Sequence, residues 1–116
     1  MQRKYRLKDR TDFKKVYRLG KATANRQVVL YYWKRNDGEA FRLGVSVSKK
    51  IGNAVVRNRM RRRIKEIVRH EAERIKQEYD FIIIVRKGAL QLDYHGLRKS
   101  ILHVLKKSGL IISSQR

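Results

Sequence analysis

The cations between Lys49 and Lys65 are the residues with the clearest chemical potential. This segment contains eight basic residues and no acidic one. Like charges at positions i and i+4, such as Arg57 and Arg61, destabilise an isolated helix. Arginine forms bidentate contacts with phosphate, and phosphate binding releases counterions. The segment therefore predicts a binding surface for a polyanion, and a solvated basic face without a fixed partner is the alternative.

The same segment is expected to open a helix, because its apolar residues recur at helical spacing. On a helical wheel the basic side chains occupy almost every direction that the apolar ones leave, and Arg57 falls inside the apolar sector. Gly52 and Asn53 precede this helix. Its free backbone N–H groups therefore offer a place for one more anion.

Few residues suit covalent or acid–base chemistry. Cysteine is absent, which excludes disulfides, thiolate metal sites and cysteine nucleophiles. His95 and His103 lie eight residues apart without a carboxylate cluster, and His70 lacks the second histidine of a zinc-protease helix. No glycine-rich phosphate loop or nucleophile elbow is present. Asp80 and Asp93 are interpreted as boundary or capping residues, so the sequence does not predict a self-sufficient enzyme.

Composition indicates a folded domain with a charged exterior. The 116 residues include 31 Lys and Arg against 10 Asp and Glu, a net charge of +21, and 41% are hydrophobic. Such an excess of charge favours a polyanionic partner. Met1–Arg10 does not resemble a signal peptide, and the apolar runs Val28–Trp33 and Phe81–Val85 are too short to span a bilayer. We expect a cytoplasmic protein without a membrane partner.

The first half of the chain predicts a helix followed by two strands. Asp9 can cap a helix that ends at Gly20, with Phe13, Val16 and Tyr17 on one side. Gln27–Arg35 and Phe41–Ser48 are typical strands, and the Asn36-Asp37-Gly38 turn between them predicts an antiparallel hairpin. The second strand is expected to place one set of side chains in the core and to leave an accessible face, formed by Arg42, Gly44, Ser46 and Ser48.

The second half predicts a helix, a strand and a helix. Asn53–Ile75 carries apolar residues on one side (Val56, Met60, Ile64, Ile67, Val68 and Ile75), Phe81–Val85 is apolar on both faces, and Leu92–Lys107 ends before Gly109. The fold class is therefore α+β, an α/β sandwich in the order α-β-β-α-β-α with room for one more strand before the long helix. We expect one domain over residues 1–116, with a core of about 5–108 and flexible ends at 1–4 and 110–116. General rules make the crossover through the long helix right-handed.

A resemblance to the bacterial ribonuclease P protein family becomes specific at Val45–Arg59. This run is similar to the family signature, which ends in an Arg-Asn-Arg motif matched by Arg57-Asn58-Arg59. Asp12–Tyr17, Ala24–Arg26 and Asp80–Arg86 resemble further family segments. The similarity covers roughly residues 5 to 107.

The resemblance implies that the chain assists a catalytic RNA. In this family the RNA subunit uses Mg²⁺, held mainly by RNA, to remove the 5′ leader of precursor tRNA. The implied partners are ribonuclease P RNA and precursor tRNA, with no obligate protein partner and a possible dimer. No catalytic residue and no firm metal ligand are expected in the protein. The family fold is similar to the second domain of a small-subunit ribosomal protein and implies a left-handed crossover, which we follow over the general rule.

The resemblance also implies two RNA-binding surfaces. Leader-binding residues are expected between the first helix and the sheet, where rings can stack on bases; for Phe13 and Tyr17, an ordinary place in the core is the alternative. The basic amino terminus, Arg3, Lys4, Arg6 and Lys8, either adds phosphate contacts or forms a mobile arm. A ribosomal protein, a duplex-DNA binder and a free-standing nuclease are the rival functions. The predicted leader-binding residues are Phe13, Tyr17, Tyr31, Arg42, Ser46, Ser48, Lys49 and Lys50. The predicted contacts to the catalytic RNA are Arg57, Asn58, Arg59, Arg61, Arg62 and Lys65.

Overall fold

The chain folds around a four-stranded mixed sheet with one helix on one face and two on the other. The computed structural model describes residues 2–111. In chain order its elements are α1 (Arg10–Leu19), β1 (Lys21–Ala24), β2 (Val28–Lys34), β3 (Arg42–Ser46), α2 (Ala54–His70), β4 (Tyr79–Val85) and α3 (Tyr94–Ser108). Short 3₁₀ turns cover Arg3–Tyr5, Ala72–Arg74 and Lys87–Gln91.

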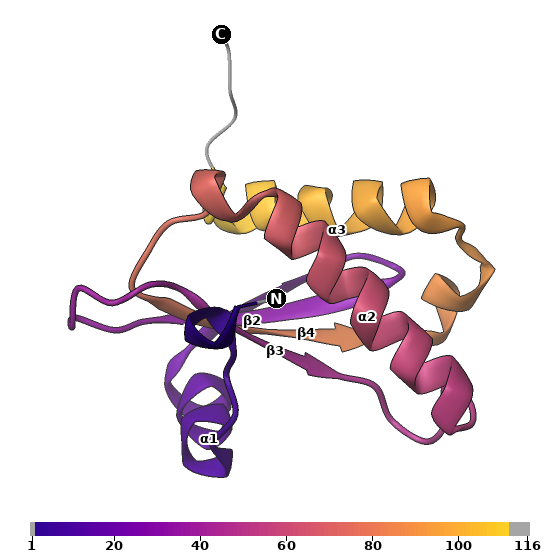
Figure 1. Cartoon of the computed structure of the whole chain (residues 1–116), viewed down its shortest axis with the longest axis horizontal. Helices are drawn as coiled ribbons and strands as arrows, with labels where there is room; N and C mark the ends of the chain where they lie inside the picture. The colour runs from indigo at the N-terminus through magenta and orange to yellow at the C-terminus, as the bar shows by residue number, and fades with distance from the viewer. Residues whose placement is uncertain (1, 112–116) are drawn as a thin grey trace, which may run out of the picture.

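The layers confirm the predicted α+β class. The strand order is β1-β2-β4-β3, with β3 parallel to β4 and the other neighbours antiparallel. Helix α1 lies alone on one side of the sheet, whereas α2 and α3 lie on the other (Figure 1). The unit β3–α2–β4 is the predicted crossover between parallel neighbours. Its left hand stays a prediction.

The predicted hairpin between Gln27–Arg35 and Phe41–Ser48, which correspond to β2 and β3, is wrong. Strand β4 lies between them, with Val29 opposite Ile84 on one side and Ser46 opposite Ile84 on the other. Phe81, Ile82 and Ile83 are fully buried because both faces of the strand are covered, and its backbone pairs with a neighbour on each edge. The hairpin of this sheet instead joins β1 to β2. The sequence allowed one more strand, but β1 comes before the two predicted strands and not after them.

The start of α2 was predicted correctly, but its end was not. Asn53 caps the helix by accepting a hydrogen bond from the backbone N–H of Val56 at 3.0 Å. The helix stops at His70, before the expected Ile75. Glu71 is buried there and bonds Arg74 and Arg98. The pair with Arg74 is local, the pair with Arg98 joins the helix end to α3, and Ile75 enters the core from outside the helix.

Helices α1 and α3 follow the predicted boundaries. Asp93 caps α3 by accepting from the N–H of Gly96 at 2.8 Å, and Gly109 ends it in the left-handed region at φ 81°. Asp9 occupies the cap position of α1 without a side-chain bond to the helix. Leu97, Ile101, Val104 and Leu105, which share one side of α3, are all buried.

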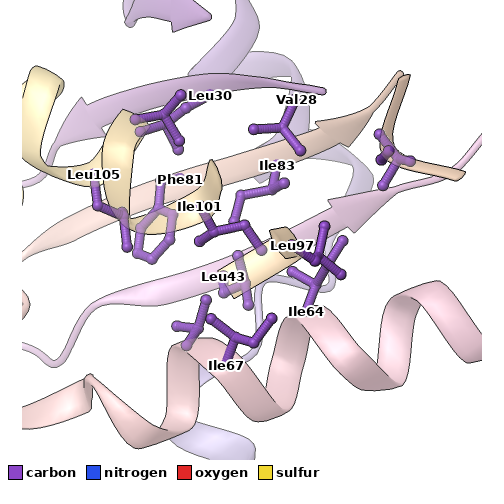
Figure 2. Close-up of a cluster of buried hydrophobic side chains, with 14 of the residues drawn as sticks. Val28, Leu30, Leu43, Ile64, Ile67, Phe81, Ile83, Leu97, Ile101 and Leu105 are labelled. Carbon is purple, nitrogen blue, oxygen red and sulfur yellow. The ribbon is translucent and has the colours of Figure 1, made fainter. Parts of the chain in front are cut away.

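The main core lies between the sheet and the pair α2 and α3. Phe81 and Ile83 from β4 meet Ile64 and Ile67 from α2 and Ile101 from α3 (Figure 2). A second, smaller cluster under α1 contains Leu7, Val16 and Ile82.

The core continues beyond the predicted boundary at residue 108. Leu110 and Ile111 are 1% and 4% exposed, and Ile111 forms a bridge with Ile75. The carbonyl of Leu110 accepts from the N–H of Lys76 at 2.8 Å. The rest of the predicted flexible tail, 112–116, lies outside the described residues. Between residues 2 and 111, no helix combines the length and the apolar character needed to cross a membrane.

Candidate nucleic-acid interface

Helix α1 packs on the sheet through one buried residue and one ring. Val16 is fully buried in the cluster with Ile82. Phe13 lies against Gly44 of β3, where a Cβ atom would collide with the ring. Glycine at position 44 therefore allows the ring and the strand backbone to approach closely. These contacts hold α1 across the sheet but leave part of this face of the sheet uncovered.

Three aromatic side chains border that uncovered face. The rings of Tyr17 and Tyr31 meet edge to face, with centroids 5.0 Å apart and an interplanar angle of 79°. Tyr17 is 40% exposed, while Phe13 and Tyr31 are half-buried. Burial raises the pKa of the Tyr17 hydroxyl, and a hydrogen bond with Ser46 acts against this rise. Four predicted leader-binding residues thus lie together.

The floor beside the rings is a row of half-buried residues across three strands. Val29 of β2, Ile84 of β4 and Ser46 of β3 share one register row. Alternation along β2 places Val29 on the same face as Tyr31, two residues later. We call this surface the aromatic cleft: Phe13, Tyr17, Tyr31, Val29, Ile84 and Ser46. It offers flat rings and an apolar floor, which suit unpaired bases.

Arg42 does not join the aromatic cleft. Its guanidinium bonds both oxygens of Asp80, at 2.8 and 2.7 Å, and pairs with Asp12 of α1 at 3.4 Å. The hydrogen bonds to Asp80 raise the pKa of Arg42. The same carboxylate also accepts from the Nη1 atom of Arg35 at 2.5 Å. In the structure the guanidinium group of Arg42 is therefore bound to the carboxylates of Asp80 and Asp12.

Asp80 was wrongly interpreted as a boundary or capping residue. It is fully buried inside β4 and is the centre of this ion-pair network. Its neighbours, Arg35 and Arg42, come from positions far away in the sequence, so no local pattern marks the pair. A charged residue inside an otherwise apolar strand is the one signal that could have suggested it, because buried charges need partners.

The turn between β3 and α2 presents the remaining predicted leader-binding residues. Ser48, Lys49 and Lys50 are all exposed. The turn is held by a bond from the N–H of Ile51 to the carbonyl of Ser48 at 3.0 Å, and by burial of the Ile51 side chain. Two exposed cations therefore follow Ser46 in the turn that leaves the end of β3.

The predicted contacts to the catalytic RNA lie on α2, some on exposed side chains and others on half-buried ones. Asn58, Arg59 and Arg62 are exposed, and Asn58 accepts from Arg61 at 2.9 Å. Arg57 is half-buried, and within the described part of the chain its Nε atom has no hydrogen-bond acceptor. A buried donor without a partner is costly, and because this Nε atom is buried, a contact of Arg57 with an oxygen from outside has to be donated by its terminal nitrogens.

A groove connects the aromatic cleft to α2. It has a volume of about 310 Å³ and is lined by Phe13 on one side and by Arg61 and Lys65 on the other. Arg6 and Lys8 also line it, because Leu7 between them is buried and its N–H bonds the carbonyl of Leu43 at 2.9 Å. Burial, followed by the charges of Arg6 and Arg61, lowers the pKa of Lys65. The groove is therefore a concentrated site of positive charge.

Comparison with known proteins identifies the family. The family model for ribonuclease P matches residues 1–109. The chain belongs to the ribonuclease P protein family. Among curated ribonuclease P protein components, that of Listeria innocua is 50% identical over 106 residues, covering 91% of this chain and 89% of its own. That of Streptococcus agalactiae serotype Ia is 46% identical over 111 residues, covering 96% and 100%.

Solved ribonuclease P proteins share the fold. The protein from Staphylococcus aureus has a TM-score of 0.85 at 39% identity, covering 93% of this chain and 98% of its own. The protein from Thermotoga maritima has a TM-score of 0.80 at 31% identity, covering 94% and 98%. These findings confirm the family and the fold that Val45–Arg59 and the neighbouring motifs predicted.

Proposed function

We propose that the chain is the protein subunit of ribonuclease P and binds two RNAs at once. The aromatic cleft takes the 5′ leader of precursor tRNA, and the exposed basic face of α2 binds the catalytic RNA. The observation that carries the proposal is the aromatic cleft itself, open to solvent and joined by a basic groove to α2. Stacking on rings is worth about 1–3 kcal/mol per base and tolerates any base, which suits leaders of varied sequence.

The charge distribution supports the second half of the proposal. Arg59 and Arg62 are exposed, and the ion pairs of the described residues do not include them. Their guanidinium groups are available for phosphates of a folded RNA. Lys49 and Lys50 lie between the two surfaces and are placed to bind the backbone where the two RNAs meet.

In this proposal the hydrolysis and its Mg²⁺ belong mainly to the RNA. No three histidine or acidic side chains between residues 2 and 111 form a group that could hold a metal ion. Asp12 and Asp80 both pair with Arg42. Magnesium prefers oxygen ligands and keeps several waters, so RNA phosphates are the fitting ligands. The protein's part is to bring substrate and catalytic RNA together and to lower their repulsion.

Cleavage of precursor tRNA at low Mg²⁺ tests the proposal. Protein alone, a bacterial ribonuclease P RNA alone, and both together are compared, and we expect efficient cleavage at the mature 5′ end only in the mixture. Cleavage by the protein alone would show a nuclease instead. If the mixture cleaves precursor tRNA no faster than the RNA alone, the chain does not act as the protein subunit.

Variants separate the two surfaces. Phe13→Ala should weaken binding of precursor tRNA by the complex while leaving its affinity for leaderless tRNA unchanged. Arg59→Gln should weaken assembly with the catalytic RNA. Tyr94→Ala is the matched control, since Tyr94 is a half-buried ring on α3, on the opposite side of the sheet. Equal losses in Tyr94→Ala and Phe13→Ala would remove the aromatic cleft from the proposal.

A further inference from the structure

Asp37 and Gly38 form the one place in the sequence where an aspartate or asparagine precedes a glycine. At such a pair the backbone nitrogen of the glycine can attack the side-chain carboxyl carbon, because glycine has no Cβ atom to block the approach. The new C–N bond displaces the hydroxyl of the protonated carboxyl, which leaves as water with the amide proton, and a five-membered succinimide remains. Water then opens this ring. Opening at the main-chain carbonyl of Asp37 gives isoaspartate, in which the chain continues through the side-chain carbon.

Solvent reaches this pair freely. Asp37 and Gly38 are both exposed. Apart from its chain neighbours, no described residue has an atom within 4 Å of the position that a Cβ atom on Gly38 would take. Gly38 adopts φ 72°, in the left-handed region that glycine enters without steric cost. Packing therefore does not protect the pair, and protection has to come from the bonds that hold the two reacting groups.

The carboxylate of Asp37 is held by three N–H groups. The Nε and Nη2 atoms of Arg35 donate to it at 2.9 and 3.1 Å, and the backbone N–H of Glu39 donates at 3.0 Å. Arg35 is itself fixed, because it is 7% exposed and also donates to Asp80 and to the carbonyl of Ala40. The hydrogen bonds from Arg35, followed by the one from Glu39, lower the pKa of Asp37. The carboxyl is therefore kept ionised, whereas the reaction needs it protonated.

The attacking nitrogen, that of Gly38, is held by Glu78, the residue before β4. Its N–H donates to the Oε2 atom of Glu78 at 2.7 Å. A negative charge at this distance opposes loss of the amide proton, which the attack requires. Glu78 adopts φ 70°, a conformation that costs a non-glycine residue free energy. Its backbone is fixed there, since its carbonyl accepts from the N–H of Arg35 at 2.6 Å and its N–H donates to the carbonyl of Glu39 at 2.9 Å.

We propose that Asp37–Gly38 is a succinimide-forming modification site whose reaction Arg35 and Glu78 hold back in the folded chain. Protonation of the Asp37 carboxyl has to displace Arg35, and the Gly38 nitrogen has to lose its proton beside the charge of Glu78. The folded chain therefore isomerises slowly, and loss of either bond exposes the pair to reaction. Isoaspartate adds a carbon to the main chain of the turn and moves the carboxylate, so Arg35 loses a partner in the ion-pair network around Asp80.

The test is the rate at which isoaspartate accumulates at position 37 of the full chain at neutral pH, folded in buffer and unfolded in guanidinium chloride. Peptide mapping with an isoaspartyl methyltransferase measures the fraction, and heavy-oxygen water marks each opening of the ring. The folded chain should react more slowly than the unfolded chain by at least about tenfold, the value of one hydrogen bond to a charged group. Glu78→Gly should keep the fold, because glycine adopts the positive φ, and should raise the folded rate about tenfold without changing the unfolded rate.

Glu73→Gln is the control for charge, since Glu73 is an exposed glutamate in the turn after α2 and its loss should leave the rate unchanged. The inference is overturned if the folded chain reacts as fast as the unfolded one, if neither reacts, or if the control accelerates the reaction as much as Glu78→Gly does. A slower reaction in Glu78→Gly would also overturn it, because Glu78 would then act as the base that removes the amide proton. Circular dichroism checks the fold, and if Glu78→Gly is unfolded, Glu78→Gln gives the same comparison with a smaller rise.

Discussion

The helices cover the two faces of the central sheet to different extents. On the face covered by α2 and α3, Leu30, Phe81 and Ile83 are fully buried. On the face covered by α1 alone, only a small cluster around Val16 is closed, and Tyr31 remains half-exposed. One helix of ten residues cannot cover a four-stranded sheet. The closed face supplies most of the hydrophobic stabilisation, and the open face keeps rings available to a ligand.

The largest expected effect compares one phenylalanine from each face. Phe81→Ala removes a fully buried ring from the main core and should lower the free energy of unfolding by about 4 kcal/mol. Phe13→Ala removes a half-buried ring and should cost about 1–2 kcal/mol. Urea unfolding of the two variants measures both losses. Equal losses would mean that α1 closes its face as fully as α2 and α3 close theirs.

The next effect concerns the ion-pair network that ties α1 to the sheet. Asp80→Asn removes the buried carboxylate between Arg35 and Arg42 and should cost about 3 kcal/mol, because the 7% exposed Arg35 loses its buried partner. Asp37→Asn is the control, since it removes an exposed partner of the same arginine and should cost much less than Asp80→Asn. Both are measured by urea unfolding. If the two losses are alike, Asp80 is not the centre of the network.

Local signals in the sequence were sufficient to predict the helix starts and the central strand. Asn53 and Asp93 both cap helices as their residue types predict. The apolar run at Phe81–Val85 correctly indicated burial on both faces. The basic character of α2 and the rings of the aromatic cleft were likewise visible, because they depend on residue type and spacing within one element.

What the sequence could not provide were pairings between distant residues. The turn at Asn36–Gly38 is locally typical of a hairpin, but β4, more than forty residues later in the chain, takes the place beside β2. The accessible strand position of Arg42 gives no sign of its bond to Asp80, which lies 38 residues later in the chain. At the early end of α2, Glu71 pairs with the distant Arg98. In each case a contact with a residue far along the chain outweighs the local preference.

The smallest expected effect lies outside both faces, on the exposed side of α2. Glu66 accepts from Arg69 at 2.7 Å and contacts His70 at 2.9 Å. The hydrogen bond from Arg69, with a smaller effect from His70, lowers the pKa of Glu66 to about 2. The folded protein therefore holds this proton less tightly than the unfolded chain does. The contribution to stability is complete above the unfolded pKa of about 4.3 and is lost as pH falls from there to about 2.

An NMR titration of the Glu66 carboxyl carbon should give a midpoint near 2. In Arg69→Gln the midpoint should rise towards 4.3, the value of an unperturbed glutamate. Binding of precursor tRNA should not change in this variant, since the pair faces away from the aromatic cleft. A midpoint near 4.3 in the unmodified protein would contradict the pairing. A loss of leader binding in Arg69→Gln would mean that the outer side of α2 and the open face of the sheet are coupled, and that the separation between stabilising and binding surfaces is incomplete.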